Sequence, residues 1–132
     1  MDSDIRDLIP QHKHDLERAQ ALIERGYPAV SPVLPDLFIW LQDGNWPVSH
    51  VIAPFLVSLG LIVVDEVRKI LASTDDIWKY WVLFFVIGES QELQEALHNE
   101  LWRLATNPTV GEHLEDVDEI AREIIRKATN SP

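Results

Sequence analysis

The sequence predicts an all-α protein. Apolar residues recur at spacings of three and four positions in almost every segment, which is the period of an amphipathic helix. No segment alternates apolar and β-branched residues with polar ones between hairpin turns, as the strands of a half-buried sheet do. Prolines, glycines and capping residues separate the apolar segments, so we expect short helices joined by short connections.

The first half of the chain contains three predicted helices after a short helical turn near residues 5–9. The helix over residues 15–26 ends at a glycine, the residue that most often follows the last turn of a helix. Three prolines then precede a second helix over residues 37–41. Pro47 is suited to the first position of a third helix, which ends at Gly60.

The second half contains four more predicted helices. The fourth covers residues 64–73, and the fifth, over residues 77–87, is apolar nearly all round. A helix of that kind needs neighbours on several sides, so we expect it at the centre of the fold. The sixth covers residues 93–104, and the last, over residues 109–128, begins with the spacing of a capping box.

A weak internal repeat predicts how these helices are arranged. Two segments each run from an apolar helix through aspartate to a tryptophan, Trp46 or Trp78, and then into another helix. Their separation is typical of helical-hairpin repeats, which stack into a right-handed superhelix. We therefore expect a HEAT-like α-α superhelix of six or seven main helices in one domain, residues 1–132. A compact bundle without repeats is the alternative.

The same two segments resemble a small bacterial family of unassigned function with HEAT-like helical repeats. The family is marked by a W-L-Q-D-x-N-W-P-V segment, here residues 40–48, and a D-D-x-W-K-Y segment, here residues 75–80. The resemblance covers about residues 5–88. It implies the helical fold and a bacterial source, and it supplies no catalytic residues.

These segments also contain the candidate binding site. In a stack of hairpins both connecting turns lie on the same edge, where their side chains would form one ridge. Tryptophan and tyrosine are enriched among the residues that dominate binding at protein interfaces. The alternative is structural: the acidic residues cap helices, and the indole rings of Trp78 and, less deeply, Trp46 pack neighbouring hairpins together. The candidate residues are Trp40, Asp43, Asn45, Trp46, Asp75, Asp76, Trp78 and Tyr80.

Neither a metal site nor a common catalytic centre is indicated. The chain has no cysteine, and the spacing of His12 and His14 does not place them on one face of a helix. Phosphate-binding glycine loops and the motifs of serine hydrolases and zinc proteases are absent from the sequence. Asp43 or Asp76, beside tryptophans, is the only candidate for acid–base chemistry. We therefore expect no metal, no cofactor and no enzymatic activity.

The net charge of −11 restricts the partners that the chain can attract. It repels phosphate backbones and anionic lipid surfaces, and 11 Lys and Arg residues are few for a nucleic-acid groove. We therefore expect no nucleic-acid or membrane partner, and, with no basic leader or membrane-length apolar segment, a cytoplasmic location.

Acidic residues predominate in the expected C-terminal capping helices, about residues 89–132. They either form a solubilising cap or attract a basic partner. Those near the last helix are Glu112, Glu115, Asp116, Asp118, Glu119 and Glu123.

The leading hypothesis for function is a non-catalytic protein–protein interaction module. Helical repeats present broad surfaces, and the acidic charge suits an immunity-type or adaptor protein for a basic partner. The chain would act as a monomer or a weak homodimer. The alternative is an enzyme or small-ligand binder with a pocket near Trp46 and Trp78.

Overall fold

The all-α prediction is confirmed. The computed structural model describes residues 4–129, and within this range the chain forms nine α-helices, four 3-10 helices and no β-strand. The α-helices are α1 (Leu16–Arg25), α2 (Leu34–Ile39), α3 (Pro47–Ser58), α4 (Val64–Leu71), α5 (Asp76–Phe85), α6 (Gln91–Ala96), α7 (His98–Thr106), α8 (Val110–Leu114) and α9 (Val117–Thr129). The 3-10 helices are η1 (Ile5–Leu8), η2 (Ser31–Val33), η3 (Gly60–Val63) and η4 (Ile87–Glu89).

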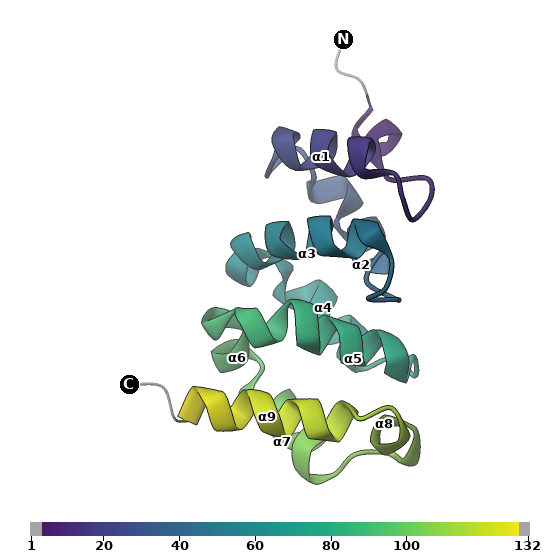
Figure 1. Ribbon diagram of the computed structural model, residues 1–132. Helices are drawn as coiled ribbons and strands as arrows, with labels where there is room; N and C mark the ends of the chain where they lie inside the picture. The colour runs from purple at the N-terminus through teal and green to yellow at the C-terminus, as the bar shows by residue number, and fades with distance from the viewer. Residues whose placement is uncertain (1–3, 130–132) are drawn as a thin grey trace.

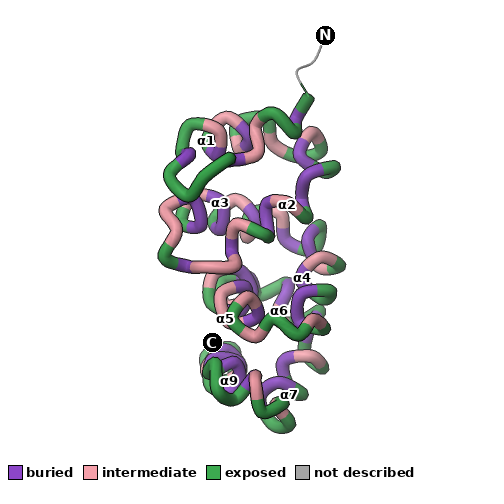
Figure 2. The backbone as a smooth tube through the Cα atoms, turned by 90° about the vertical axis from the view of Figure 1, so that its right-hand side faces the viewer, coloured by how far each residue is buried: buried purple, intermediate pink, exposed green. Residues whose placement is uncertain are grey.

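The helices are stacked in two layers, from the N-terminal end at the top of Figure 1 to the C-terminal end at the bottom. Helices α1, α3, α5 and α9 form the first layer and run in the same direction, with their N-terminal ends on the right in Figure 1. Helices α2, α4 and α7 belong to the second layer, as the turned view in Figure 2 shows. The layers are joined where α5 contacts α4 and where α7 packs along α9.

A unit of helix, 3-10 turn and helix occurs three times within residues 4–129. In each, a long helix leads through a 3-10 turn into a shorter helix: α1–η2–α2, α3–η3–α4 and α5–η4–α6. The first two long helices are followed by Gly26 and Gly60, whose φ angles are 67° and 57°. Only glycine adopts such angles without steric cost, so these two residues permit the chain to turn back into the second layer.

The structure divides two of the predicted helices, which is why it has nine rather than six or seven. The segment 93–104 forms α6 and α7, because Leu97 between them has φ −105° and ψ 20° and leaves the helical conformation. The segment 109–128 forms α8 and α9, because Asp116 has a positive φ of 61°. Aspartate tolerates the left-handed region better than most residues, so the chain can change direction there.

Helix α5 occupies a middle position in the stack, between α3 and α9 (Figures 1 and 2). It has neighbours on several sides, with contacts to α4, α9 and η4, but one side of this apolar helix is not covered. Ile77 and Phe84 are each 50% exposed, whereas Lys79 is only 4% exposed. A two-layer stack explains this difference, because the outer side of the first layer has no further helix to cover it.

The hydrophobic core is continuous between the two layers, and helices from both contribute to it. Every α-helix except α8 therefore buries an apolar side against its neighbours, which at about 25 cal/mol per Å² is the main term favouring the stack. The largest fully buried side chains include Leu22, Phe38, Leu56, Leu83, Leu93 and Leu104.

Among residues 4–129, no single helix is both long enough and apolar enough to cross a membrane. Helix α3 and the segment Gly60–Leu71 meet the length and composition requirements only as a pair, and the two are bent by 117° relative to each other.

The turn between α2 and α3 lies directly against α5 through Gly44. A Cβ atom at Gly44 would overlap the indole ring of Trp81. The Ser49 hydroxyl lies 2.6 Å from the carbonyl oxygen of Trp40 and 2.9 Å from that of Asp43, so it can donate to either. These contacts hold the turn in place and let its backbone approach α5 closely.

We expect Gly44→Ala to lower the free energy of unfolding by about 1–3 kcal/mol, because the added methyl group forces the Trp81 ring to move. Urea unfolding measures the change. Asn45→Ala, at the exposed neighbouring position, is the control and should change stability by less than about 0.5 kcal/mol. Equal stability of the two variants would contradict the close approach of Gly44 to Trp81.

Candidate binding surfaces

The eight residues predicted as a binding site fall into two groups in the structure. Trp40, Asp43, Asn45 and Trp46 belong to the turn between α2 and α3. Their rings and polar groups pack locally: the Trp40 and Trp46 rings meet edge to face at 5.4 Å, and the Asp43 carboxylate accepts the Asn45 N–H at 2.8 Å. Both tryptophans are half-buried against the core, and Asn45 is exposed.

The second group lies at the start of α5. The Asp75 carboxylate accepts the Trp78 N–H at 3.1 Å and caps the helix. The indole N–H of Trp78 donates to the carbonyl of Phe38 at 2.8 Å and so ties α5 to α2. Tyr80 lies further along α5, where its ring stacks on Phe84. These contacts direct the side chains of the second group to three different neighbours.

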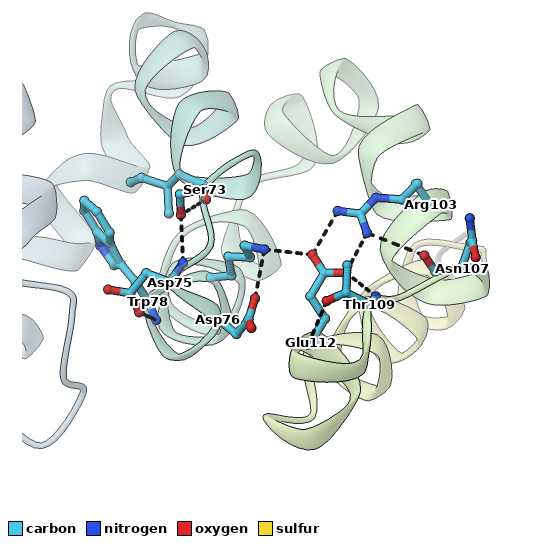
Figure 3. Close-up of polar contacts among 10 residues, drawn as sticks. Ser73, Asp75, Asp76, Trp78, Arg103, Asn107, Thr109 and Glu112 are labelled. Atoms are coloured by element: carbon cyan, nitrogen blue, oxygen red, sulfur yellow. Dashed lines mark hydrogen bonds and ion pairs between the residues drawn. The ribbon is translucent and has the colours of Figure 1, made fainter.

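Asp76, the remaining residue of the second group, belongs to a buried ion network that joins α5, α7 and α8 (Figure 3). The Lys79 ammonium lies 2.8 Å from Glu112 Oε2 and 2.9 Å from Asp76 Oδ1. Arg103 reaches the same Glu112 carboxylate with both terminal nitrogens, one of them at 2.9 Å. The side chains of Lys79 and Glu112 are only 5% and 1% exposed.

The capping box predicted at the start of the last helices holds Glu112 in place. The Thr109 hydroxyl accepts the Glu112 N–H at 3.1 Å, and the Glu112 carboxylate accepts the Thr109 N–H at 2.8 Å. Beside it, a Cβ atom on Gly111 would collide with the Asp76 carboxylate, so α8 lies directly against the start of α5. The capping box is therefore confirmed, and it directs its glutamate into the interior.

The hydrogen bonds determine the charge of this network. Burial by itself would raise the pKa of Glu112, but donors from Arg103, Lys79 and Thr109 outweigh it and lower the pKa to about 2. Burial would lower the pKa of Lys79, but its bonds to Glu112 and Asp76 raise it above the usual value. At neutral pH the glutamate is ionised and the lysine protonated, so the pair acts as a structural cluster and has no proton to exchange near neutrality.

Two of the acidic residues expected at the C-terminal surface are buried instead. Glu112 is fully buried, and Asp118 lies 2.8 Å from Nδ1 of His113 and 3.4 Å from Arg122. Neither carboxylate contributes to an exposed acidic surface that could attract a basic partner.

The sequence held one signal for the buried ion network, which is the lone lysine Lys79 within an apolar helix. A buried cation needs an anionic partner, so Lys79 indicates a buried carboxylate nearby.

Two surface grooves open on the outer side of the first layer, one on each side of Phe84. The groove between α3 and α5 has a volume of about 530 Å³ and is mainly apolar, whereas the groove between α5 and α9 has a volume of about 350 Å³ and carries carboxylates. Neither these two grooves nor a third one between α4 and α7 is lined by Trp46 or Trp78.

An aromatic cluster forms the wall between the two grooves. The rings of Trp81, Phe84 and Phe85 contact one another at centroid distances between 5.2 and 5.8 Å. On the α3 side, the His50 ring meets Phe85 edge to face at 5.3 Å. On the α9 side, Tyr80 stacks on Phe84. Phe84 is half-exposed on a helix whose other rings hold it in position, so it forms a fixed apolar projection.

Carboxylates surround this projection. Glu89 lines both grooves, and Asp116, Glu119 and Glu123 line the groove between α5 and α9. Glu123 is paired with Lys127 at 3.2 Å. Glu89, Asp116 and Glu119 form no ion pair within residues 4–129, so their charges remain available to an external cation. Sequence reasoning missed this surface because it assigned the apolar α5 to the centre of the fold and sought the binding site at the Asp–Trp turns.

We expect Glu112→Gln to lower the free energy of unfolding by about 3 kcal/mol, because it leaves the buried Lys79 with a single anionic partner. Chemical denaturation measures the loss. Glu115→Gln, an exposed acidic residue in the next turn, is the matched control and should cost less than about 0.5 kcal/mol. Similar losses for both variants would show that the network does not stabilise the fold.

The same carboxylate makes stability depend on pH. Its pKa is about 2 in the folded protein and 4.5 in the absence of the fold, so between these values the unfolded state binds more protons. The contribution of Glu112, about 3 kcal/mol, is therefore complete above pH 5 and is lost as the pH falls toward 2. Urea unfolding at several pH values should show the wild type converging on Glu112→Gln. A difference that stays constant down to pH 2.5 would contradict the lowered pKa.

Comparison with protein families gives one match, and its extent covers the surfaces described above. The family model, described as a domain of unknown function, matches residues 8–125. The matched range extends beyond residue 88, where the resemblance noted in the sequence ends, and it includes α7, α8 and most of α9. No curated protein matches the sequence. The chain therefore belongs to the family of domains of unknown function designated DUF5071.

Proposed function

We propose that this protein is a non-catalytic protein–protein interaction module that binds a basic partner on the outer side of its first layer. The observation that carries the proposal is the half-exposed ring of Phe84, which stands between two grooves. Glu89, Asp116 and Glu119 line these grooves and form no ion pair within residues 4–129. Buried aromatic anchors supply much of the binding energy at protein interfaces, and a ring already held in position loses little entropy on binding.

The proposal includes a HEAT-like α-α superhelix as the scaffold. Three successive units of helix, 3-10 turn and helix, and the two-layer stack of Figures 1 and 2, support this arrangement. In such scaffolds each hairpin contacts only its neighbours, and one layer of helices is left as a continuous surface for partners. Here that layer consists of α1, α3, α5 and α9.

Charge supports a basic rather than an acidic or neutral partner. The chain has a net charge of −11, and Glu89, Asp116 and Glu119 place part of it beside Phe84. Complementary charge raises the rate of association and suppresses binding of acidic competitors, and its effect weakens as salt increases. An immunity-type or adaptor protein that must find a basic target quickly would benefit from this arrangement.

The alternative of a small-ligand or catalytic pocket near Trp46 and Trp78 has less support. The indole of Trp78 is engaged with the carbonyl of Phe38, and the three described grooves are lined by other residues. We therefore retain the interaction module as the single proposed function.

We expect the immobilised protein to retain a Lys- and Arg-rich protein from a lysate of its source organism at 50 mM salt. We expect Phe84→Ala to weaken the affinity for that partner about 30-fold. Titration of the purified partner by isothermal calorimetry measures the affinity. Trp102→Ala is the matched control, because Trp102 is 44% exposed but lies on α7 outside both grooves. A partner held equally by both variants, or an acidic partner, would contradict the proposal.

A further inference from the structure

We propose that the occupant of this surface is a basic amphipathic α-helix of the partner, which lies over Phe84. Its apolar side chains enter the groove between α3 and α5, and its Lys or Arg side chains reach the carboxylates of the groove between α5 and α9. This inference rests on the proposed function and specifies the chemistry of the bound segment.

The groove between α3 and α5 favours a helix over an extended peptide. Its walls are mostly apolar side chains, including Ala53, Pro54, Val57 and Phe85. Both walls are helices, whose backbone groups bond within the helix, so the groove offers no strand edge to pair with. An extended peptide would lose water from its N–H and C=O groups without gaining partners, whereas a helix satisfies its own backbone.

A second feature of this groove favours donors on the bound helix. Glu89 lines this groove beside its apolar walls, and its carboxylate forms no ion pair within residues 4–129. Apolar walls that end beside a carboxylate suit a long side chain with an aliphatic stem and a cationic head.

The neighbouring groove has the same combination with more charge. The half-buried ring of Tyr80 and the half-exposed ring of Phe84 provide apolar surface for the methylene groups of Lys or Arg. Asp116 and Glu119 line the same groove and can bind the cationic head. The exposed face of the Phe84 ring adds a cation–π contact to a charge placed above it. A helix with one apolar side and one basic side matches the two grooves together.

The same charges argue against two other occupants. A second copy of this chain seated face to face would bring the carboxylates at Phe84 against their own counterparts, which costs free energy. An anionic lipid surface would be repelled by the same groups. The partner helix is the occupant that both the shape and the charge of the surface favour.

The test uses three synthetic peptides as probes, each of 18 residues with a fluorescent label. The first contains Leu and Lys with Leu at positions i, i+3, i+4 and i+7; the second scrambles this order; the third replaces Lys by Glu. By fluorescence polarisation at 50 mM salt, we expect the first to bind about tenfold more tightly than the second and at least about 100-fold more tightly than the third. Circular dichroism should show the first peptide helical in the complex.

Variants of the protein locate the binding. Phe84→Ala should weaken binding of the first peptide about tenfold, and the double variant Glu89→Gln/Glu119→Gln about fivefold, whereas Trp102→Ala should change it less than twofold. Thermal melts confirm that each variant is folded. Equal effects of Phe84→Ala and Trp102→Ala would overturn the assignment of the surface.

The outcomes separate this inference from the proposed function. If the scrambled peptide binds as tightly as the helical one, charge alone determines binding and the inference of a helical occupant fails, while a basic partner remains supported. The inference of a helical occupant also fails, and the proposed function stands, if Phe84→Ala weakens capture of a basic protein but the helical peptide does not bind. Self-association that Phe84→Ala abolishes, measured by ultracentrifugation, would assign the surface to a second copy and overturn the inference. Absence of both the captured protein and peptide binding would overturn both proposals.

Discussion

The carboxylate of Glu112 is the group on which the lower part of the stack depends. It accepts hydrogen bonds from Lys79 on α5, from Arg103 on α7 and from the N–H of Thr109 before α8. A buried charge without its partners is so costly that these groups must come together or the segment does not fold. Helix α8, only five residues long, therefore joins the last helix to the middle of the molecule.

This attachment also shapes the outer surface. Helix α9 follows α8 directly, packs along α5 and α7, and forms one wall of the groove that contains Asp116 and Glu119. The position of that wall relative to Phe84 thus depends on contacts made on the other side of α5, where Lys79 meets Glu112. The buried network and the exposed grooves therefore lie on two sides of one helix.

Local signals in the sequence were enough for the helical class and for most helix ends. Asp75, Ser90 and Thr109 each cap the helix that follows them, and such ends can be predicted because a capping bond joins residues only two or three positions apart. The break at Leu97 carries no comparable local signal.

The candidate site was less predictable, because its contacts are made between residues far apart in the chain. The sequence identified the Trp78 segment, but it could not show that the indole reaches Phe38, 40 residues away. Nor could it show which side of α5 stays uncovered, since an apolar residue such as Phe84 looks the same in a core as on a binding surface.

The four first-layer helices point the same way (Figure 1), and each carries a dipole along its axis. These dipoles add rather than cancel, so the outer face has an electrical direction. A helix bound along this face, as proposed above, would gain a small stabilisation when its axis runs antiparallel to them, because opposite partial charges then meet at the helix ends.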